Sequence, residues 1–282
     1  LVFVRRQRRL PVPLLDLGLF RIRALSGTMA LSLLFAFIMG GTGLVVTLFL
    51  QLVKGYSPFQ VALWMVLPAL AMVAAGNLSG VAARRIRPAY LIAGGAVLAA
   101  VGTAVLTQVS ATGSLAVLLT GLVLAYAGGG PITVLSPLLI MSSAPPEKAG
   151  SAGSLQATGS EFGTALGVAV LGLTATAVYQ AAVTVPGGVP GELAEIARES
   201  VAGGVLAAGR VAGPAGAELL ASAREAFTTG LHVTAGITLA MFLALASVAL
   251  GGLRRVPPTG AAPAGPPTGG EPEAAAAQTV GG

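Results

Sequence analysis

Long runs of apolar residues, separated by short polar segments, dominate the pattern along this chain. Six runs are close to the roughly 20 residues that a helix needs to cross a bilayer. They lack the alternation of apolar and polar residues over about ten positions that marks membrane strands. Because lipid offers the backbone no hydrogen-bond partner, each run is expected to be a helix. The predicted spans are residues 26–50, 58–78, 89–106, 115–141, 158–179 and 227–250.

The second run carries the clearest signal for a helix start. Ser57 is a favoured N-cap, Pro58 suits the first helical position, and Gln60 completes a capping box. Three prolines fall inside predicted spans, where each removes a backbone donor and predicts a kink. They are Pro68, Pro131 and Pro137.

Composition narrows the class of protein. Only 9% of the 282 residues are charged, against about 25% in soluble domains, and the mean hydropathy is +0.86. The chain is therefore interpreted as an all-α integral membrane protein. Its net charge of +6 suits an anionic membrane surface and not nucleic acid. It has no cysteine and none of the P-loop, HExxH or GxSxG motifs, so no enzyme activity, metal or cofactor is expected.

The basic residues predict an orientation in the cell membrane. Twelve of the sixteen fall on one side of the predicted bundle. They are Arg5, Arg6, Arg8, Arg9, Arg21, Arg23, Arg84, Arg85, Arg87, Lys148, Arg254 and Arg255. Because basic residues flank the cytoplasmic ends of spans, both termini are expected in the cytoplasm.

The flanks and the long loop have their own expected structures. Residues 1–25 form a basic, amphipathic lead-in, either an interfacial helix or a plain charged flank. The extracytoplasmic loop 181–226 is expected to hold two short surface helices, near 191–200 and 217–227, or to be a mobile loop. The Pro, Gly and Ala-rich tail 253–282 is expected to be disordered and cytoplasmic. A start at Leu1 in place of Met suggests a fragment or a non-AUG start.

One acidic residue, Glu161, lies inside an apolar run, where a charge is expensive and usually functional. Gly159, Gly163 and Gly167 are four residues apart and form a stripe that lets another helix approach closely. Glu161 lies about 200° around the helix from Gly163, and it shares its face with Thr164. One side of this span is therefore expected to pack, while the acid points elsewhere.

Two interpretations of Glu161 are open. If it faces a cavity of low dielectric, it binds a proton readily, and a neighbouring cationic compound favours its ionised form instead. Proton and cation would then exclude each other. Alternatively, Glu161 lies in the first turns of its span, near the headgroups, stabilised by the helix N-terminus.

A second group of residues would suit a wall that binds lipophilic cations, because it combines aromatic, sulfur and amide groups. Its members are Gln51, Gln60, Trp64, Met65, Tyr126 and Gln156, with Thr164 beside the acid. The alternative for each is ordinary packing or an aromatic belt at the interface. The single histidine, His232, is interpreted as an interfacial or pore-wall residue.

Four stretches together resemble the C-terminal part of a fourteen-span drug:proton antiporter of the major facilitator superfamily, of the QacA/EmrB type. They are RRQRRLPVPLLDLGLFR, FLQLVKGYSPFQVALWMVLPAL, APPEKAGSAGSLQATGSEFGTALGVAVLG and AREAFTTGLHVTAGI. The resemblance covers about residues 3–252. The segment GVAARRIRP also resembles a degenerate copy of the superfamily's cytoplasmic Gly/Arg motif, a gating loop. It keeps Gly80, Arg84, Arg85 and Arg87 but lacks the usual acid.

The resemblance implies a six-helix transmembrane bundle that is the C-terminal half of a major facilitator fold. It implies part of a multidrug efflux transporter that uses the proton gradient to export lipophilic or cationic compounds. Its partners would be membrane lipid, these substrates and an N-terminal transmembrane bundle that this chain lacks, which would supply the other wall of the site. An exporter of a metabolite, sugar or lipid, or a non-transporting membrane module, remains the alternative.

Overall fold

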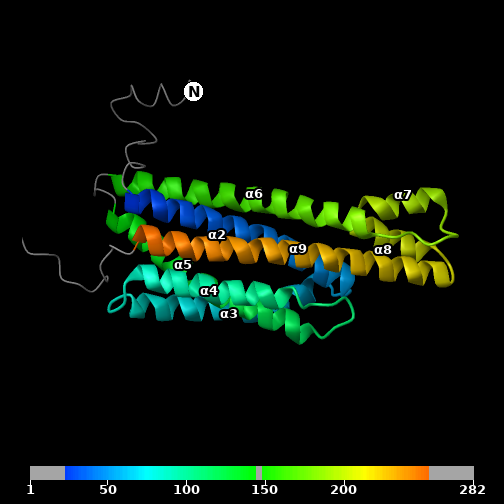
Figure 1. The fold of residues 1–282 in the computed structure, drawn as a ribbon, viewed down its shortest axis with the longest axis horizontal. Helices are drawn as coiled ribbons and strands as arrows, with labels where there is room; N and C mark the ends of the chain where they lie inside the picture. Colours follow the sequence, from blue (N-terminus) through cyan, green and yellow to red (C-terminus); the bar gives the residue numbers. More distant parts are fainter. Residues whose placement is uncertain (1–22, 144–147, 254–282) are drawn as a thin grey trace, which may run out of the picture.

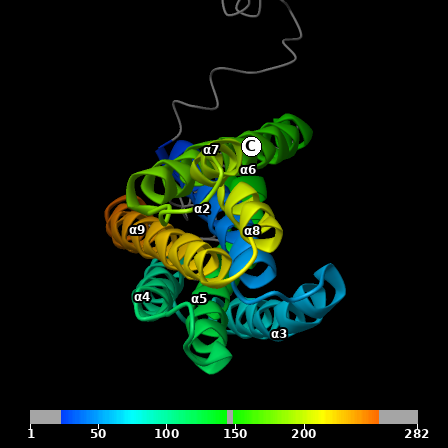
Figure 2. The ribbon, with the colours of Figure 1, turned by 90° about the vertical axis from the view of Figure 1, so that its right-hand side faces the viewer.

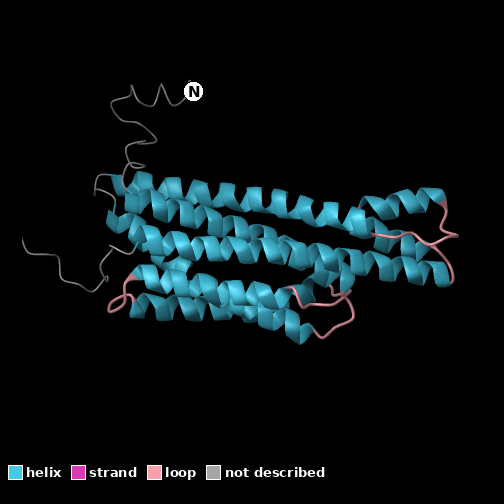
Figure 3. Ribbon diagram, viewed as in Figure 1, coloured by secondary structure: helices cyan, strands magenta, loops and turns pink. Residues whose placement is uncertain are grey.

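The computed structural model describes residues 23–143 and 148–253, and the ordered elements of these residues are helices (Figures 1 and 3). In chain order they are α2 (Arg23–Leu48), the π-helix η2 (Phe49–Val53), α3 (Pro58–Ala82), α4 (Pro88–Leu106), α5 (Leu115–Ser143), α6 (Ala149–Ala182), α7 (Gly191–Glu199), α8 (Val201–Arg210) and α9 (Pro214–Leu253). Most of the predicted lead-in 1–25 and of the predicted tail 253–282 lies outside the described residues, namely 1–22 and 254–282.

Six of these helices are long and apolar enough to cross a membrane: α2 with η2, α3, α4, α5, α6 and α9. This confirms the expected all-α fold with six spans. The spans run side by side, and the start of α2 and the end of α9 lie at the same end of the bundle (Figure 1). We call this end the inner end and the opposite end, which carries α7 and α8, the outer end.

Two helices begin well before their predicted spans. α6 begins at Ala149, because no proline follows Pro146 and the small residues of 149–157 continue the helix. α9 begins at Pro214, a residue suited to a first helical position, and then runs unbroken for 40 residues. The prediction of a separate short helix at 217–227 was therefore wrong, because these residues form the start of α9. The second short helix of the loop is α8 instead.

The central helix of the bundle is α2, which packs against α6, α9 and α5. α4 lies between α5 and α9, while α3 packs mainly against α5. Seen along the bundle, α4 and α9 lie on one side, and α3 and α6 form the two edges of the other (Figure 2). The side chains of α3 are mostly exposed as a result, including large apolar ones such as Phe59 and Leu70.

The contact between α2 and α6 depends on glycines. A Cβ atom built on Gly163 would lie 2.5 Å from the carbonyl oxygen of Leu33, and one on Gly167 would collide with the carbonyl of Phe37. Gly159, expected in the same stripe, has no α2 atom within 4 Å of such a Cβ. The reason is that α2 and α6 separate toward the inner end, where a cavity lies between them.

The three prolines lie inside helices, Pro68 in α3 and the other two in α5. Pro68 and Pro131 are buried, whereas Pro137 is exposed. Pro131 packs beside Gly95 of α4, where a Cβ on the glycine would lie 3.0 Å from the proline ring. The kinks themselves stay a prediction.

The glycine contacts generate a stability prediction. Gly167→Ala should lower the free energy of unfolding by about 1–3 kcal/mol, because the added methyl group overlaps the backbone of α2. Gly159→Ala is the matched control on the same helix, and it should be neutral or slightly stabilising, since alanine favours helix. Thermal or denaturant unfolding of the purified protein in detergent measures both. Equal stability of the two variants would contradict the close α2–α6 contact.

Candidate substrate and proton site

Glu161 lies on the exposed side of α6, turned away from the face that packs on α2. Among residues 23–143 and 148–253, its carboxylate has no hydrogen bond or ion pair. Gly163 lies against Leu33 and Gly167 against Phe37, while Thr164 lies against Gly40, so Glu161 falls between the levels of Leu31 and Phe37 on α2. That range is about 12–21 Å along α2 from the helix start at Arg23, at 1.5 Å per residue. The acid is thus in the inner half of the bundle.

The neighbours of Glu161 divide between two faces. Ala165 and Val168 are exposed with it. Thr164 is half-buried instead, because its backbone and methyl group lie against Gly40 of α2. Its hydroxyl donates to the carbonyl oxygen of Ser160 at 3.0 Å. Thr164 therefore lies at the edge between the packed face and the face of the acid.

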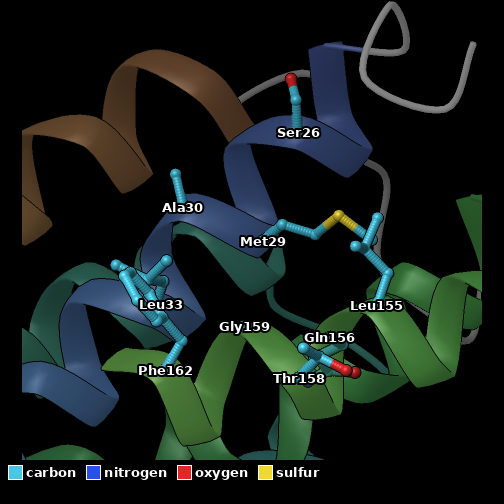
Figure 4. A pocket seen from close by; sticks show the side chains of 9 residues that line it. All are labelled: Ser26, Met29, Ala30, Leu33, Leu155, Gln156, Thr158, Gly159 and Phe162. Atoms are coloured by element: carbon cyan, nitrogen blue, oxygen red, sulfur yellow. The ribbon is translucent and has the colours of Figure 1, made fainter. Parts of the chain in front are cut away.

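A cavity of about 540 Å³ opens between α2 and α6 at the inner end (Figure 4). Its lining is mainly apolar, with the amide of Gln156 and the hydroxyl of Thr158 as polar groups of α6. The lining residues are Ser26, Met29, Ala30, Leu33, Leu155, Gln156, Thr158, Gly159 and Phe162. Glu161 is adjacent in sequence to Phe162 but does not line the cavity.

Gln156 is the one predicted wall residue that lines this cavity. Sequence reasoning missed Met29, Leu33 and Phe162, whose apolar side chains look like ordinary span residues. The spacing of the α2 set, 26, 29, 30 and 33, is that of one helical face. This spacing indicates that the four residues share one face of α2, but it does not show which helix packs opposite that face.

The other predicted wall residues lie toward the outer end. Gln51 is in η2, roughly 30 Å along α2 from Met29. Met65 and Tyr126 are half-buried against the same apolar cluster, which includes Val61 and Leu122. Trp64 is 37% exposed on α3. The structure therefore separates the predicted wall into an inner part, Gln156, and an outer part.

Gln60 stabilises the start of α3. Its Oε1 accepts the backbone N–H of Ser57 at 2.9 Å, while Ser57 Oγ accepts the N–H of Gln60 at 3.3 Å. This confirms the predicted capping box, with Pro58 in the first turn. The carboxamide oxygen of Gln60 thus already has a partner at the helix end.

The residues of the Gly/Arg segment lie at the turn between α3 and α4. Arg84, Arg85 and Arg87 are exposed there, and Arg87 is the N-cap of α4. A Cβ on Gly80 would make an ordinary 3.5 Å contact with Val134 of α5. Lys148, also exposed, precedes α6 at the same inner end.

A bundle of six apolar spans suits a membrane transporter domain, and within residues 23–143 and 148–253 it holds an acid, Glu161, inside a span without a partner. The family model of the Major Facilitator Superfamily matches residues 2–168. This chain belongs to the Major Facilitator Superfamily.

Several curated relatives share its sequence. It is 33% identical to the multidrug efflux pump LfrA of Mycolicibacterium smegmatis over 249 residues, which are 88% of this chain and 49% of the pump. It is 31% identical to the tetracenomycin C resistance and export protein of Streptomyces glaucescens, over 88% of this chain and 47% of that protein. For the methyl viologen resistance protein SmvA of Salmonella typhimurium, the identity is 30%, over 87% of this chain and 50% of the relative. The chain spans about half the length of these relatives.

Proposed function

We propose that this chain is the C-terminal six-span half of a proton-coupled exporter of lipophilic or cationic compounds. The observation that carries the proposal is the similarity, at 30–33% identity over most of this chain, to a multidrug efflux pump and two resistance proteins. Each of these relatives is about twice as long as the matched segment. A second six-helix bundle would then supply the opposite wall of the transport site.

Glu161 is the residue that we assign to proton coupling. The support is its position on α6, in an apolar span and about 12–21 Å from the level of Arg23, with no partner in the described part of the chain. An ionisable side chain within an apolar span is usually functional. Since Glu161 does not line the inner cavity, we assign the exchange of proton for cation to the exposed face of α6 that carries this acid.

The inner cavity is the part of this half that we assign to the substrate. Its volume of about 540 Å³ lies within the range of pockets for small molecules. Met29, Leu33 and Phe162 supply apolar and aromatic contacts, and Gln156 supplies one amide. Such a lining favours a lipophilic compound over a sugar, whose hydroxyls would need many more polar partners.

Glu161→Gln, made in the complete transporter, tests the coupling. The amide keeps the shape but does not titrate, so the variant should lose gradient-driven efflux while still transporting substrate down its own gradient. For each coupled proton, a difference of one pH unit across the membrane supports about a tenfold ratio of substrate concentrations. In the variant this pH-driven ratio should disappear. Efflux of a fluorescent cation from vesicles with an imposed pH gradient measures it.

The matched control is Glu195→Gln, which neutralises an exposed acid of α7 far from the cavity. It should leave the pH-driven efflux unchanged. Glu161→Asp should retain partial coupling, because the carboxylate remains. Wild-type coupling in Glu161→Gln would place the proton site elsewhere in the transporter.

Expression of the 282-residue chain alone should leave ethidium accumulation in cells unchanged, because one bundle supplies only one wall of the site. Co-expression of an N-terminal bundle from the same transporter should restore efflux. Proton-dependent efflux by the purified chain alone would instead indicate that two copies act as the two bundles. Loss of transport with both halves present would favour a non-transporting module.

The inner end is assigned to the cytoplasm, because the exposed Arg84, Arg85 and Lys148 gather there. The chain lacks cysteine, so single cysteines report their own accessibility. Gly209→Cys, in an open position on α8, should react with an impermeant thiol reagent in intact cells. Arg85→Cys should react only after permeabilisation. The reverse pattern would invert the orientation.

A further inference from the structure

A second pocket, of about 530 Å³, lies at the outer end, far from the inner cavity. One side is the loop between α4 and α5, and the other is a single face of α9. The lining residues are Val109, Ser110, Ala111, Thr112, Ala217, Leu220, Ala221, Arg224, Glu225, Thr228, Thr229 and His232. Unlike the inner cavity, this pocket has charged residues, Arg224 and Glu225 of α9, and its loop side carries the hydroxyls of Ser110 and Thr112.

Arg224 is the central observation. The residue is half-buried, and its Nε atom is fully buried without a hydrogen-bond partner. Its guanidinium makes no ion pair with any residue of the described ranges 23–143 and 148–253. An N–H group withdrawn from water needs an acceptor, because a buried donor without one is unfavourable. Residues 23–143 and 148–253 supply no acceptor for Nε, and the rest of the half-buried guanidinium remains open to the pocket.

Lys54 adds a second positive charge behind the loop. Its Nζ donates to the carbonyl oxygens of Ala111 at 2.9 Å and Gly113 at 2.6 Å, and to that of Ser110 at 3.3 Å. Burial lowers the pKa of the Lys54 ammonium, and the positive charge of Arg224 lowers it further. The two cations therefore repel each other, and an anion between α9 and the loop would relieve this repulsion.

His232 fixes the other end of the pocket. Its Nε2 lies 2.6 Å from the carbonyl oxygen of Val109. Because a carbonyl only accepts, Nε2 donates and carries a proton. This bond holds α9 against the end of α4 and keeps the imidazole at the pocket wall.

The hydroxyl groups differ in what they offer a ligand. Those of Thr228 and Thr229 donate to the carbonyl oxygens of Arg224 and Glu225, at 2.7 and 3.2 Å. Ser110 and Thr112 are exposed, and no side-chain hydrogen bond engages their hydroxyls within the described residues. Both can therefore donate to a ligand.

The charges of the pocket favour an anion. Glu225 is exposed at the rim and is the one acid of the lining. In the lining Arg224 balances this acid, and Lys54, which lies behind the loop and outside the lining, adds a further positive charge. The planar guanidinium matches the oxygens of carboxylate and phosphate, and the hydroxyls on the loop can reach further oxygens of a tetrahedral group.

We propose that this outer pocket binds a phosphate group, held by Arg224 and by the hydroxyls of Ser110 and Thr112. The volume far exceeds that of a halide ion and admits a phosphate with its substituent. Two sources share this chemistry, the headgroup of a phospholipid and a free phosphate. The site is independent of the proposed transport site, since it uses no residue of the inner cavity.

Two binding measurements on the purified chain separate the sources. Native mass spectrometry with dioleoylphosphatidylglycerol reports a retained lipid, and equilibrium dialysis with radiolabelled inorganic phosphate reports the free ion. In either case Arg224→Gln should weaken binding about tenfold, which corresponds to ~1.4 kcal/mol. Arg210→Gln, which removes an exposed charge of α8 outside the pocket, should leave it unchanged.

The outcomes decide the proposal and its ligand. Lipid binding that depends on Arg224 assigns the site to a headgroup, and phosphate binding with the same dependence assigns it to a free phosphate. Arg224→Lys keeps the charge and should bind more tightly than Arg224→Gln, which separates a binding role from a folding role. The proposal is overturned if neither ligand binds, or if Arg210→Gln weakens binding as much as Arg224→Gln.

Discussion

Direct contact between helix backbones is the constraint on which this bundle depends. In lipid, apolar side chains gain little by leaving the surrounding hydrocarbon, so helices associate through close packing and small residues. At the three largest interfaces an added Cβ atom would meet backbone of the neighbouring helix within 3 Å. Such contacts pair Gly167 with Phe37, Gly102 with Gly121 and Gly130 with Gly76. α2 and α6, α4 and α5, and α3 and α5 are held in this way.

The inner cavity follows from where that contact stops. α2 and α6 touch at Gly163 and Gly167, but at Gly159 they have separated. The space between them is then lined by the side chains of one face of each helix. The same contact fixes the rotation of α6, and that rotation turns Glu161 away from α2. The packing of this glycine stripe on α2 therefore determines both where the cavity opens and which way Glu161 faces.

The sequence predictions that the structure supports rest on patterns of residues close together in the chain. Apolar runs predicted six spans, and Ser57 with Gln60 predicted the capping box that the hydrogen bonds show. The cavity could not be predicted, because it requires knowing that the face of Met29 meets the face of Phe162. The type of a residue also does not show how far along the bundle axis it lies. Gln51 and Gln156 were therefore predicted to share one wall, although Gln51 lies toward the outer end and Gln156 toward the inner end of the bundle. A helix was predicted at 217–227, but no local signal indicated that it continues without a break into the last span.

The two candidate sites are far enough apart to act independently. Gly230 of α9 faces Ala175 of α6, where an added Cβ would lie 2.9 Å from the carbonyl oxygen. Since the two helices run in opposite directions, Arg224 is level with about residue 181 of α6. Twenty residues of helix separate that level from Glu161, about 30 Å. At an effective dielectric constant of about 20, two unit charges 30 Å apart interact by only about 0.6 kcal/mol. A change of charge at the outer pocket should therefore act on Glu161 only weakly, and a stronger coupling between the two sites would have to pass through movement of the helices.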